Sequence, residues 1–191
     1  MKRIGLLGGT FNPVHIAHLT MAQTVAEKLG LDKVIFVPAH FPPHKKSTTL
    51  TSAEDRFKMV QLAIKSNPQF EISDFEIKRG GKSYTIDTVK HFKKIYPRQT
   101  KFFFILGEDS YSHLPEWKSI DQLKKLTAFA VVNRDFSKKK KNRIPCYFID
   151  MPTLEISSSD LRKRIAQGRS VKYLIPGRVL KYIQGHKLYQ R

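Results

Sequence analysis

The sequence predicts an α/β protein: a doubly wound, mainly parallel sheet of the Rossmann-like kind, covered by helices on both faces and followed by C-terminal helices. Three observations support this prediction. Short apolar runs typical of strands alternate along the chain with longer amphipathic patterns typical of helices. The runs at residues 34–37 and 102–106 are apolar throughout, as expected of strands buried on both faces. Glycine or proline follows several of these segments and ends them.

The expected strands are, in chain order, residues 4–7, 34–37, 70–75, 102–106, 128–132 and 147–149. The expected helices are residues 15–29, 51–66, 85–96, 158–167 and 178–184. Gly30 closes the first helix because glycine adopts the left-handed conformation common at helix ends. Pro97 stops the third helix because the residue before a proline is disfavoured in helical geometry. The run at 102–106 is the most apolar and should be a central strand.

Length and composition indicate one domain that spans residues 1–191. A chain of 191 residues can bury about two-thirds of its unfolded surface in a single core. No apolar run approaches the roughly 20 residues of a membrane helix, and the N-terminus lacks the pattern of a signal peptide. The single cysteine, Cys146, excludes an intramolecular disulfide and fits a reducing compartment. We therefore expect a cytoplasmic protein without membrane contact, compatible with a homo-oligomer.

The formal net charge of +19 is the one unusual feature of the composition. A field of this sign attracts polyanions, which can be nucleic acid, an anionic membrane or small phosphorylated substrates. The densest block, residues 138–141, is four consecutive lysines in an expected solvated loop. A lysine-rich surface explains this charge at least as well as a nucleic-acid patch does, and no interleaved aromatic and basic RNA motif is present. No nucleic-acid partner is expected, although a basic nucleic-acid-binding module remains the alternative from a different functional class.

Polar clusters follow four of the expected strands: residues 8–18 follow the first strand, 38–46 the second, 107–117 the central one and 155–162 the last. In an open parallel sheet, ligands bind beyond the carboxyl ends of the strands, where the strand order reverses. All four clusters are therefore expected at one edge of the sheet. That edge is the predicted ligand site.

The first cluster suits a phosphate group. Gly8 and Gly9 remove side chains where the first strand ends, so that backbone N–H groups can approach an anion, and Thr10 adds a hydroxyl. His15 and His18 are one helical turn apart, at a helix N-terminus whose dipole favours negative charge.

Two other interpretations of the histidines stay open. They could be structural, or they could bind zinc with a third ligand, for which His40 and His44 are only loosely placed. The chain contains neither G-x4-G-K-[ST] nor G-x-G-x-x-G, which argues against a P-loop NTPase and a dinucleotide dehydrogenase.

The segment GGTFNPVHIAH at residues 8–18 resembles the GGTFDPxHxGH start of the nucleotidyltransferase superfamily that shares an HxGH motif. The same superfamily carries ISSTxxR near its C-terminus, and residues 156–162 of this chain are ISSSDLR. Three positions depart from the pattern: Asn12 replaces Asp, Ala17 replaces Gly, and Ser159 replaces Thr. Ala17 remains small, and Ser159 keeps the hydroxyl. Two matches in the right order are far more specific than either alone.

Three intermediate segments resemble the bacterial nicotinate mononucleotide adenylyltransferases: PPHK at residues 42–45, SYTIDT at 83–88, and GED at 107–109 followed by Leu114 and Trp117. The resemblance implies transfer of the adenylyl group of ATP to nicotinate mononucleotide, with pyrophosphate released, as a step of NAD biosynthesis. Mg²⁺ is expected to arrive with ATP, held by phosphate oxygens and water, without a metal site of the protein's own. The alternative within the same superfamily is a pantetheine-phosphate adenylyltransferase. The segments at residues 83–88 and 107–117 argue against it.

The resemblance also implies roles for individual residues on the ATP side. His15, His18 and Arg162 would be catalytic, with His18 stabilising charge on the α-phosphoryl oxygens. The residues expected to bind ATP and its phosphates are Gly8, Gly9, Thr10, Lys45, Ser157, Ser158 and Asp109. Asp109 is a candidate for a ribose hydroxyl or for magnesium. The plain alternatives are a serine N-cap for Ser157 and a solvated lysine for Lys45.

On the acceptor side, the expected contacts of nicotinate mononucleotide are His44, Tyr84, Thr85 and Trp117. Trp117, the only tryptophan, could stack on the pyridine ring, although a single tryptophan is more often part of a core. Backbone N–H groups near Tyr84 and Thr85 would suit the nicotinate carboxylate and so favour the acid over the amide.

Overall fold

A six-stranded parallel sheet forms the centre of the computed structural model, which describes residues 1–42, 50–133, 144–152 and 154–190. The strands are β1 (Arg3–Gly9), β2 (Lys33–Pro38), β3 (Phe70–Ile72), β4 (Lys101–Gly107), β5 (Ala128–Asn133) and β6 (Cys146–Asp150). Their order is β3-β2-β1-β4-β5-β6, and every neighbouring pair is parallel. The order reverses between β1 and β4, so this is where a ligand site is expected.

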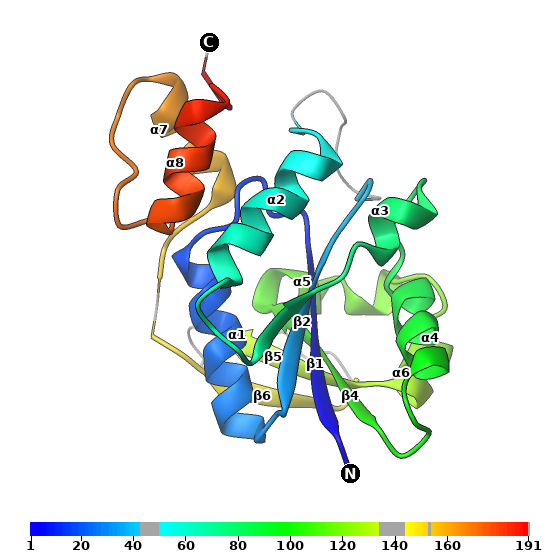
Figure 1. Cartoon of the computed structure of the whole chain (residues 1–191). Coiled ribbons are helices and arrows are strands. Elements are labelled where there is room, and N and C mark those ends of the chain that lie inside the picture. The colour runs from blue at the N-terminus through cyan, green and yellow to red at the C-terminus, as the bar shows by residue number, and fades with distance from the viewer. Residues whose placement is uncertain (43–49, 134–143, 153, 191) are drawn as a thin grey trace.

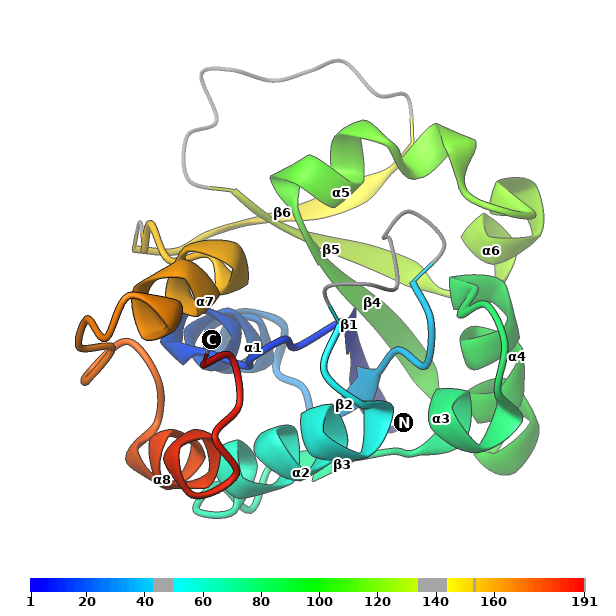
Figure 2. The same cartoon turned by 90° about the horizontal axis from the view of Figure 1, so that it is seen from above.

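Helices lie on both faces of the sheet (Figures 1 and 2). They are α1 (Ile16–Leu29), α2 (Ala53–Ile64), α3 (Phe75–Arg79), α4 (Thr85–Ile95), α5 (Glu108–Ser112), the 3-10 turn η2 (Leu114–Glu116), α6 (Ile120–Leu126), α7 (Ser158–Ala166) and α8 (Gly177–Gly185). The predicted doubly wound α/β fold is confirmed. Even α1, with 14 residues, is shorter than the roughly 20 residues of a membrane span, and none of the helices in the described part of the chain qualifies as one.

The apolar strand sequences are explained by two hydrophobic cores, one on each side of the sheet. Alternate residues of β4 enter different cores: Phe103 and Ile105 pack with α1, α2, α7 and α8, whereas Phe102 and Phe104 pack with α4, α5 and α6. A strand with both faces buried needs apolar side chains at every position. For this reason the run at 102–106 shows no alternation.

Most expected elements are confirmed to within a residue or two, and the strand predicted at residues 70–75 is the main error. β3 ends at Ile72, and Phe75 instead begins α3, where the Lys78 N–H donates to the Asp74 carbonyl over 2.9 Å. Three short elements between residues 108 and 126 are also not predicted, because helical segments of three, five and seven residues are too short to show a helical period. His15, expected inside the first helix, is its N-cap.

Candidate active site

The loop from β1 to α1 turns sharply at the carboxyl edge of the sheet. Phe11 lies in this loop with φ of 50° and is only 1% exposed. A Cβ on Gly9 would come within 2.8 Å of the Phe11 ring, and one on Gly8 within 3.0 Å of the Phe104 ring. Both glycines are therefore required by aromatic rings packed against the backbone, a reason that differs from the one inferred from sequence. The loop still presents a backbone largely bare of side chains, followed by Thr10.

The two histidines are in contact with each other at the start of α1. Their ring centroids are 3.7 Å apart. The Phe11 ring packs edge-on against the His18 ring, with centroids 5.1 Å apart. The His15 backbone N–H donates to Nδ1 of His18 over 3.2 Å. Since that nitrogen accepts a hydrogen bond, a neutral His18 ring carries its proton on Nε2. His15 is 5% exposed, while His18 is half-buried.

The C-terminal motif lies directly against this loop. Ser157 is the N-cap of α7, and its hydroxyl accepts from the Asp160 N–H over 3.1 Å. Ser158 Oγ donates to the Pro13 carbonyl over 2.9 Å. Arg162 Nη1 donates to the Asn12 carbonyl over 2.8 Å. The structure therefore brings the two ends of the chain together, as the two sequence motifs had suggested.

Asn12, where the motif has aspartate, is a buried junction of the site. It is 2% exposed, and its Oδ1 accepts from the Tyr189 hydroxyl at 2.9 Å and from the Thr51 N–H at 3.3 Å. Burial raises the pKa of Tyr189 to about 12, so this hydroxyl stays a donor at neutral pH. The amide thus ties α8's tail and the segment before α2 to the loop.

Arg56 is a functional candidate that lies outside the sequence motifs. It is 1% exposed, and its guanidinium donates to the carbonyls of four residues at 2.6 to 3.1 Å: Thr51, Thr10, Ala39 and His40. Burial lowers the pKa of this guanidinium, which is nonetheless fully charged at neutral pH. The side chain joins the ends of β1 and β2 and adds positive charge beneath the loop. A sequence signal existed, since Arg56 shares the helical stripe of Met59 and Val60, which are both fully buried.

A cavity of about 700 Å³ lies at the carboxyl edge of the sheet, between the start of α4 and the segment from α5 to Lys118. Its lining includes four predicted site residues, which are Tyr84, Thr85, Asp109 and Trp117, together with Ser83, Ser110, His113, Glu116 and Lys118. We call it the acceptor cavity. Thr85 begins α4 and Tyr84 is its N-cap, so the free N–H groups of that helix lie at the cavity. The structure places Asp109 here, with the expected acceptor contacts.

Phe104 connects the acceptor cavity to the loop. The half-buried Trp117 packs edge-on against the Phe104 ring, with centroids 5.7 Å apart. That same ring occupies the space above Gly8. The aromatic face of the cavity and the glycine backbone are thus separated by a single phenylalanine.

A buried carboxyl group in α3, that of Glu76, is hydrogen-bonded to α4. Glu76 is 6% exposed and accepts a hydrogen bond from the Thr88 hydroxyl. Burial raises the pKa of Glu76, and hydrogen bonds from Ser83 and Thr88 offset part of that rise. Ser83 Oγ also accepts from the His40 N–H over 3.0 Å, which links this network to the end of β2.

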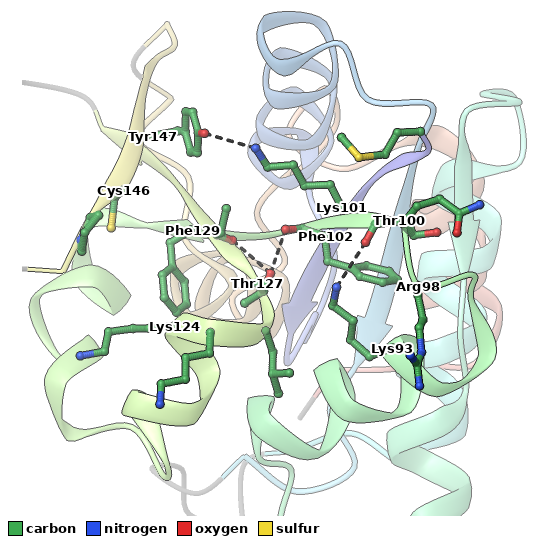
Figure 3. A pocket seen from close by; sticks show the side chains of 16 residues that line it. Lys93, Arg98, Thr100, Lys101, Phe102, Lys124, Thr127, Phe129, Cys146 and Tyr147 are labelled. Atoms are coloured by element: carbon green, nitrogen blue, oxygen red, sulfur yellow. Dashed lines mark hydrogen bonds between the residues drawn. The ribbon is translucent and has the colours of Figure 1, made fainter.

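A second cavity of about 700 Å³ lies at the opposite, amino edge of the sheet (Figure 3). It is strongly basic, and several of its cations have local partners. Lys93 donates to the Thr100 carbonyl over 3.3 Å, and Lys101 lies over the Phe103 and Tyr147 rings. Lys93 and Lys124 occupy the last turns of α4 and α6, where positive charge complements the helix carbonyls. Part of the high net charge is explained in this way.

Some predicted residues lie outside the described part of the chain, namely His44, Lys45 and residues 138–141. Within the residues that are described, no three side chains of the His, Cys, Asp and Glu types gather closely enough to hold a metal ion. His15 and His18 therefore have no third metal ligand among those residues.

Known proteins resemble this chain over its full length. Residues 6–164 match the family model described as cytidylyltransferase-like. An Oceanobacillus iheyensis protein named "Probable nicotinate-nucleotide adenylyltransferase" is 43% identical over 99% of this chain and 97% of its own length. A Lactiplantibacillus plantarum protein of the same name is 44% identical over 100% of this chain and 89% of its own length.

The fold also has solved counterparts. One is a Plasmodium falciparum nicotinic acid mononucleotide adenylyltransferase complexed with NaAD. The superposition covers 99% of this chain and 98% of the Plasmodium chain, with a TM-score of 0.83. At 24% identity, that likeness shows the fold alone. The more specific assignment comes from the Oceanobacillus and Lactiplantibacillus relatives, which are 43% and 44% identical to this chain. It agrees with the motifs at both ends of the sequence. The chain therefore belongs to the cytidylyltransferase-like family and, within it, to the bacterial nicotinate-nucleotide adenylyltransferases.

Proposed function

We propose that this protein transfers the adenylyl group of ATP to nicotinate mononucleotide, forming nicotinic acid adenine dinucleotide and pyrophosphate in NAD biosynthesis. The observation that supports it best is the hydrogen bond from Arg162 to the Asn12 carbonyl, which joins two motifs far apart in the sequence. The acceptor cavity lies at the same edge of the sheet. A triphosphate and an aromatic mononucleotide could thus be held side by side.

The reaction requires positioning and charge neutralisation more than a protein nucleophile. A 5′-phosphate oxygen of nicotinate mononucleotide attacks the α-phosphorus of ATP. A new P–O bond forms as the bond between the α-phosphorus and the bridging oxygen breaks, and pyrophosphate leaves with that oxygen. Phosphoryl-type transfers of this kind are accelerated by aligning the two reactants and by donors that stabilise the transition state.

His18 is proposed to stabilise charge on the α-phosphoryl oxygens. Its Nδ1 already accepts from the His15 backbone, which leaves the Nε2 proton as the donor of a neutral ring. His15, stacked against it at 3.7 Å, is proposed to act on the ATP side. A donor fixed in this way needs no reorganisation during the reaction.

The remaining phosphate contacts are proposed for the loop and for α7. Ser157 and Ser158 begin a nine-residue helix whose N-terminal N–H groups can take the β- and γ-phosphates, and Arg162 supplies a guanidinium one turn later. Further contacts with ATP and its phosphates are proposed for Gly8, Gly9, Thr10, Lys45 and Asp109. Asp109 lines the acceptor cavity, which favours a ribose hydroxyl as its partner.

The acceptor is proposed to lie in the acceptor cavity with its pyridine ring on Trp117. The N–H groups at the start of α4, near Tyr84 and Thr85, would take the nicotinate carboxylate. His44 is proposed as a further contact.

Mg²⁺ is proposed to enter with ATP. An ion held mostly by phosphate oxygens and water would need no cluster of ligands from the protein itself. Bound in this way, it would neutralise phosphate charge. We further propose that the chain forms one domain, since the C-terminal residues Val179 and Ile183 pack into the same core as Leu7 of β1. A cytoplasmic location is also proposed. A homo-oligomer is compatible with this proposal.

The test is an acceptor assay. Purified protein is incubated with ATP, Mg²⁺ and one acceptor at a time, and pyrophosphate release is measured for nicotinate mononucleotide, nicotinamide mononucleotide and phosphopantetheine. We expect turnover with nicotinate mononucleotide and its loss on chelation of the metal. Turnover with phosphopantetheine alone would reverse the assignment. Tight, strongly salt-dependent binding of nucleic acid without any turnover would support the basic binding module instead.

A further inference from the structure

We propose that the Lys118 ammonium sets the preference of this protein for an acceptor whose pyridine ring carries a carboxylate over one that carries an amide. The inference rests on the proposed function and assigns a specificity-determining residue within it. It concerns the side chain of the residue that directly follows Trp117.

The ammonium is held in place by an aromatic ring. Lys118 Nζ lies 4.2 Å from the centroid of the Tyr84 ring, and both residues line the acceptor cavity. A cation over a tyrosine face is attracted by the negative face of the ring. An otherwise flexible side chain therefore presents its charge at a defined place, beside the N-terminus of α4.

Lys118 forms no ion pair with a carboxylate of the described residues. Among the residues that the structure describes, no Asp or Glu lies within ion-pair distance of its Nζ, whereas Lys124 on the next helix pairs with Asp121 at 2.7 Å. The cavity lining also contains Asp109 and Glu116, and Lys118 is the one Lys or Arg among the lining residues that the structure describes. Without this ammonium, the two carboxylates would repel an anionic ring substituent.

Nicotinate mononucleotide has two anionic groups, and the geometry points Lys118 to the carboxylate. The 5′-phosphate must reach the α-phosphorus of ATP, beside the loop at the end of β1 where His15 and His18 lie. The pyridine ring lies farther out, on Trp117. Lys118 adjoins Trp117 and rests on Tyr84, so its charge acts at the ring end of the acceptor. A neutral carboxamide gains no charge–charge attraction there, whereas a carboxylate does.

The test compares kcat/KM for nicotinate and nicotinamide mononucleotide in wild type, Lys118→Met and Lys118→Arg. Methionine keeps the apolar length of the side chain, and arginine keeps the charge. We expect Lys118→Met to lower kcat/KM for the nicotinate acceptor about 10-fold, the size of one lost charge interaction near a surface. The value for the nicotinamide acceptor should change less than about 2-fold, and Lys118→Arg should keep most of the wild-type ratio.

A matched control is Lys125→Met, because Lys125 lies on α6 outside the acceptor cavity and should leave the ratio unchanged. Raising the ionic strength should lower the wild-type ratio and leave that of Lys118→Met unaltered. An equal loss with both acceptors in Lys118→Met would place the charge at the phosphate and overturn the inference. An unchanged ratio would overturn it as well. A wild-type protein that turns over neither acceptor would instead refute the proposed function itself.

Discussion

The two halves of the candidate site are built in different ways. The phosphate half, which consists of the loop 10–15, the first turn of α1 and the start of α7, is held by buried and half-buried polar groups that join distant parts of the chain. Arg162 and Tyr189 both bond to Asn12, across 150 and 177 residues of sequence. The acceptor half is an open cavity whose charged residues, such as Lys118 and Glu116, are exposed.

This difference indicates a division of labour. A phosphoryl-type reaction depends on sub-ångström alignment, and buried hydrogen bonds provide it because each broken bond leaves a costly unpaired group. Recognition of a ring substituent tolerates more freedom, and an exposed lysine can provide it. Changes in the phosphate half should therefore alter catalysis and stability together, while changes in the acceptor half should alter specificity.

The largest effect is expected for His18. We predict that His18→Ala lowers kcat by two or more orders of magnitude, because it removes a donor to the developing phosphate charge. Steady-state kinetics measures the loss, and circular dichroism should show an unchanged fold.

A second variant separates catalysis from helix capping. His18→Asn keeps an acceptor that can replace Nδ1 for the His15 N–H, but it lacks the Nε2 proton. It should be as slow as His18→Ala and closer to wild type in thermal stability. His186→Ala, at an exposed position after α8, is the matched control and should retain full activity. Normal kinetics in either His18 variant would remove this residue from the mechanism.

The fold and the phosphate half were largely predictable from the sequence, for identifiable reasons. Strands buried on both faces have continuous apolar sequences, so β4 was recognisable. The loop and α7 have motifs at fixed spacing. Arg56 was not predictable in its role, since its four acceptors are backbone carbonyls from three separate segments, and backbone groups carry no sequence signature.

The acceptor half was predicted in its residues but not in its architecture. Tyr84, Thr85 and Trp117 are predictable from the motifs, whereas α5, η2 and α6 are not, because such short elements are fixed by tertiary packing. The same limit explains Phe75, whose apolar side chain extended the predicted strand although it begins α3.

A second prediction concerns Arg56 and tests whether the phosphate half couples stability to catalysis. Arg56→Met should lower the free energy of unfolding by about 3 kcal/mol, because four carbonyls lose their donor in a buried place. It should also raise KM for ATP about 10-fold through the displaced loop, while KM for the acceptor changes less. Urea unfolding and initial-rate kinetics give the two quantities.

The conservative variant sharpens this result. Arg56→Lys keeps the charge but reaches fewer carbonyls, so it should recover part of the ATP affinity and little of the stability. If Arg56→Met lost stability while both KM values and kcat stayed at wild-type levels, the side chain would be a structural tie without influence on the loop.

The smallest effect is expected at Glu76, beneath the acceptor half, and it appears in the pH dependence of stability. Burial raises the pKa of Glu76 above its ordinary value of 4.5, against the opposing influence of Ser83, Thr88 and Arg79, while Asp87 adds to the rise. The folded state therefore holds this proton more tightly than the unfolded state does. The stability that the neutral carboxyl provides is complete below pH 4.5 and is lost as the pH rises through the folded-state pKa.

Glu76→Gln isolates this contribution, because the amide keeps an acceptor for Thr88 and cannot titrate. Urea unfolding at a series of pH values from 4 to 8 should show wild type losing stability relative to Glu76→Gln as the pH rises, since only wild type must bury a charge there. The acceptor KM should stay close to wild type in this variant, because Glu76 supports α4 from below and does not line the cavity. Parallel stability curves for the two proteins would mean that the folded structure accommodates the carboxylate without cost. The buried network around Glu76 would then tolerate a charge as readily as the open acceptor cavity does.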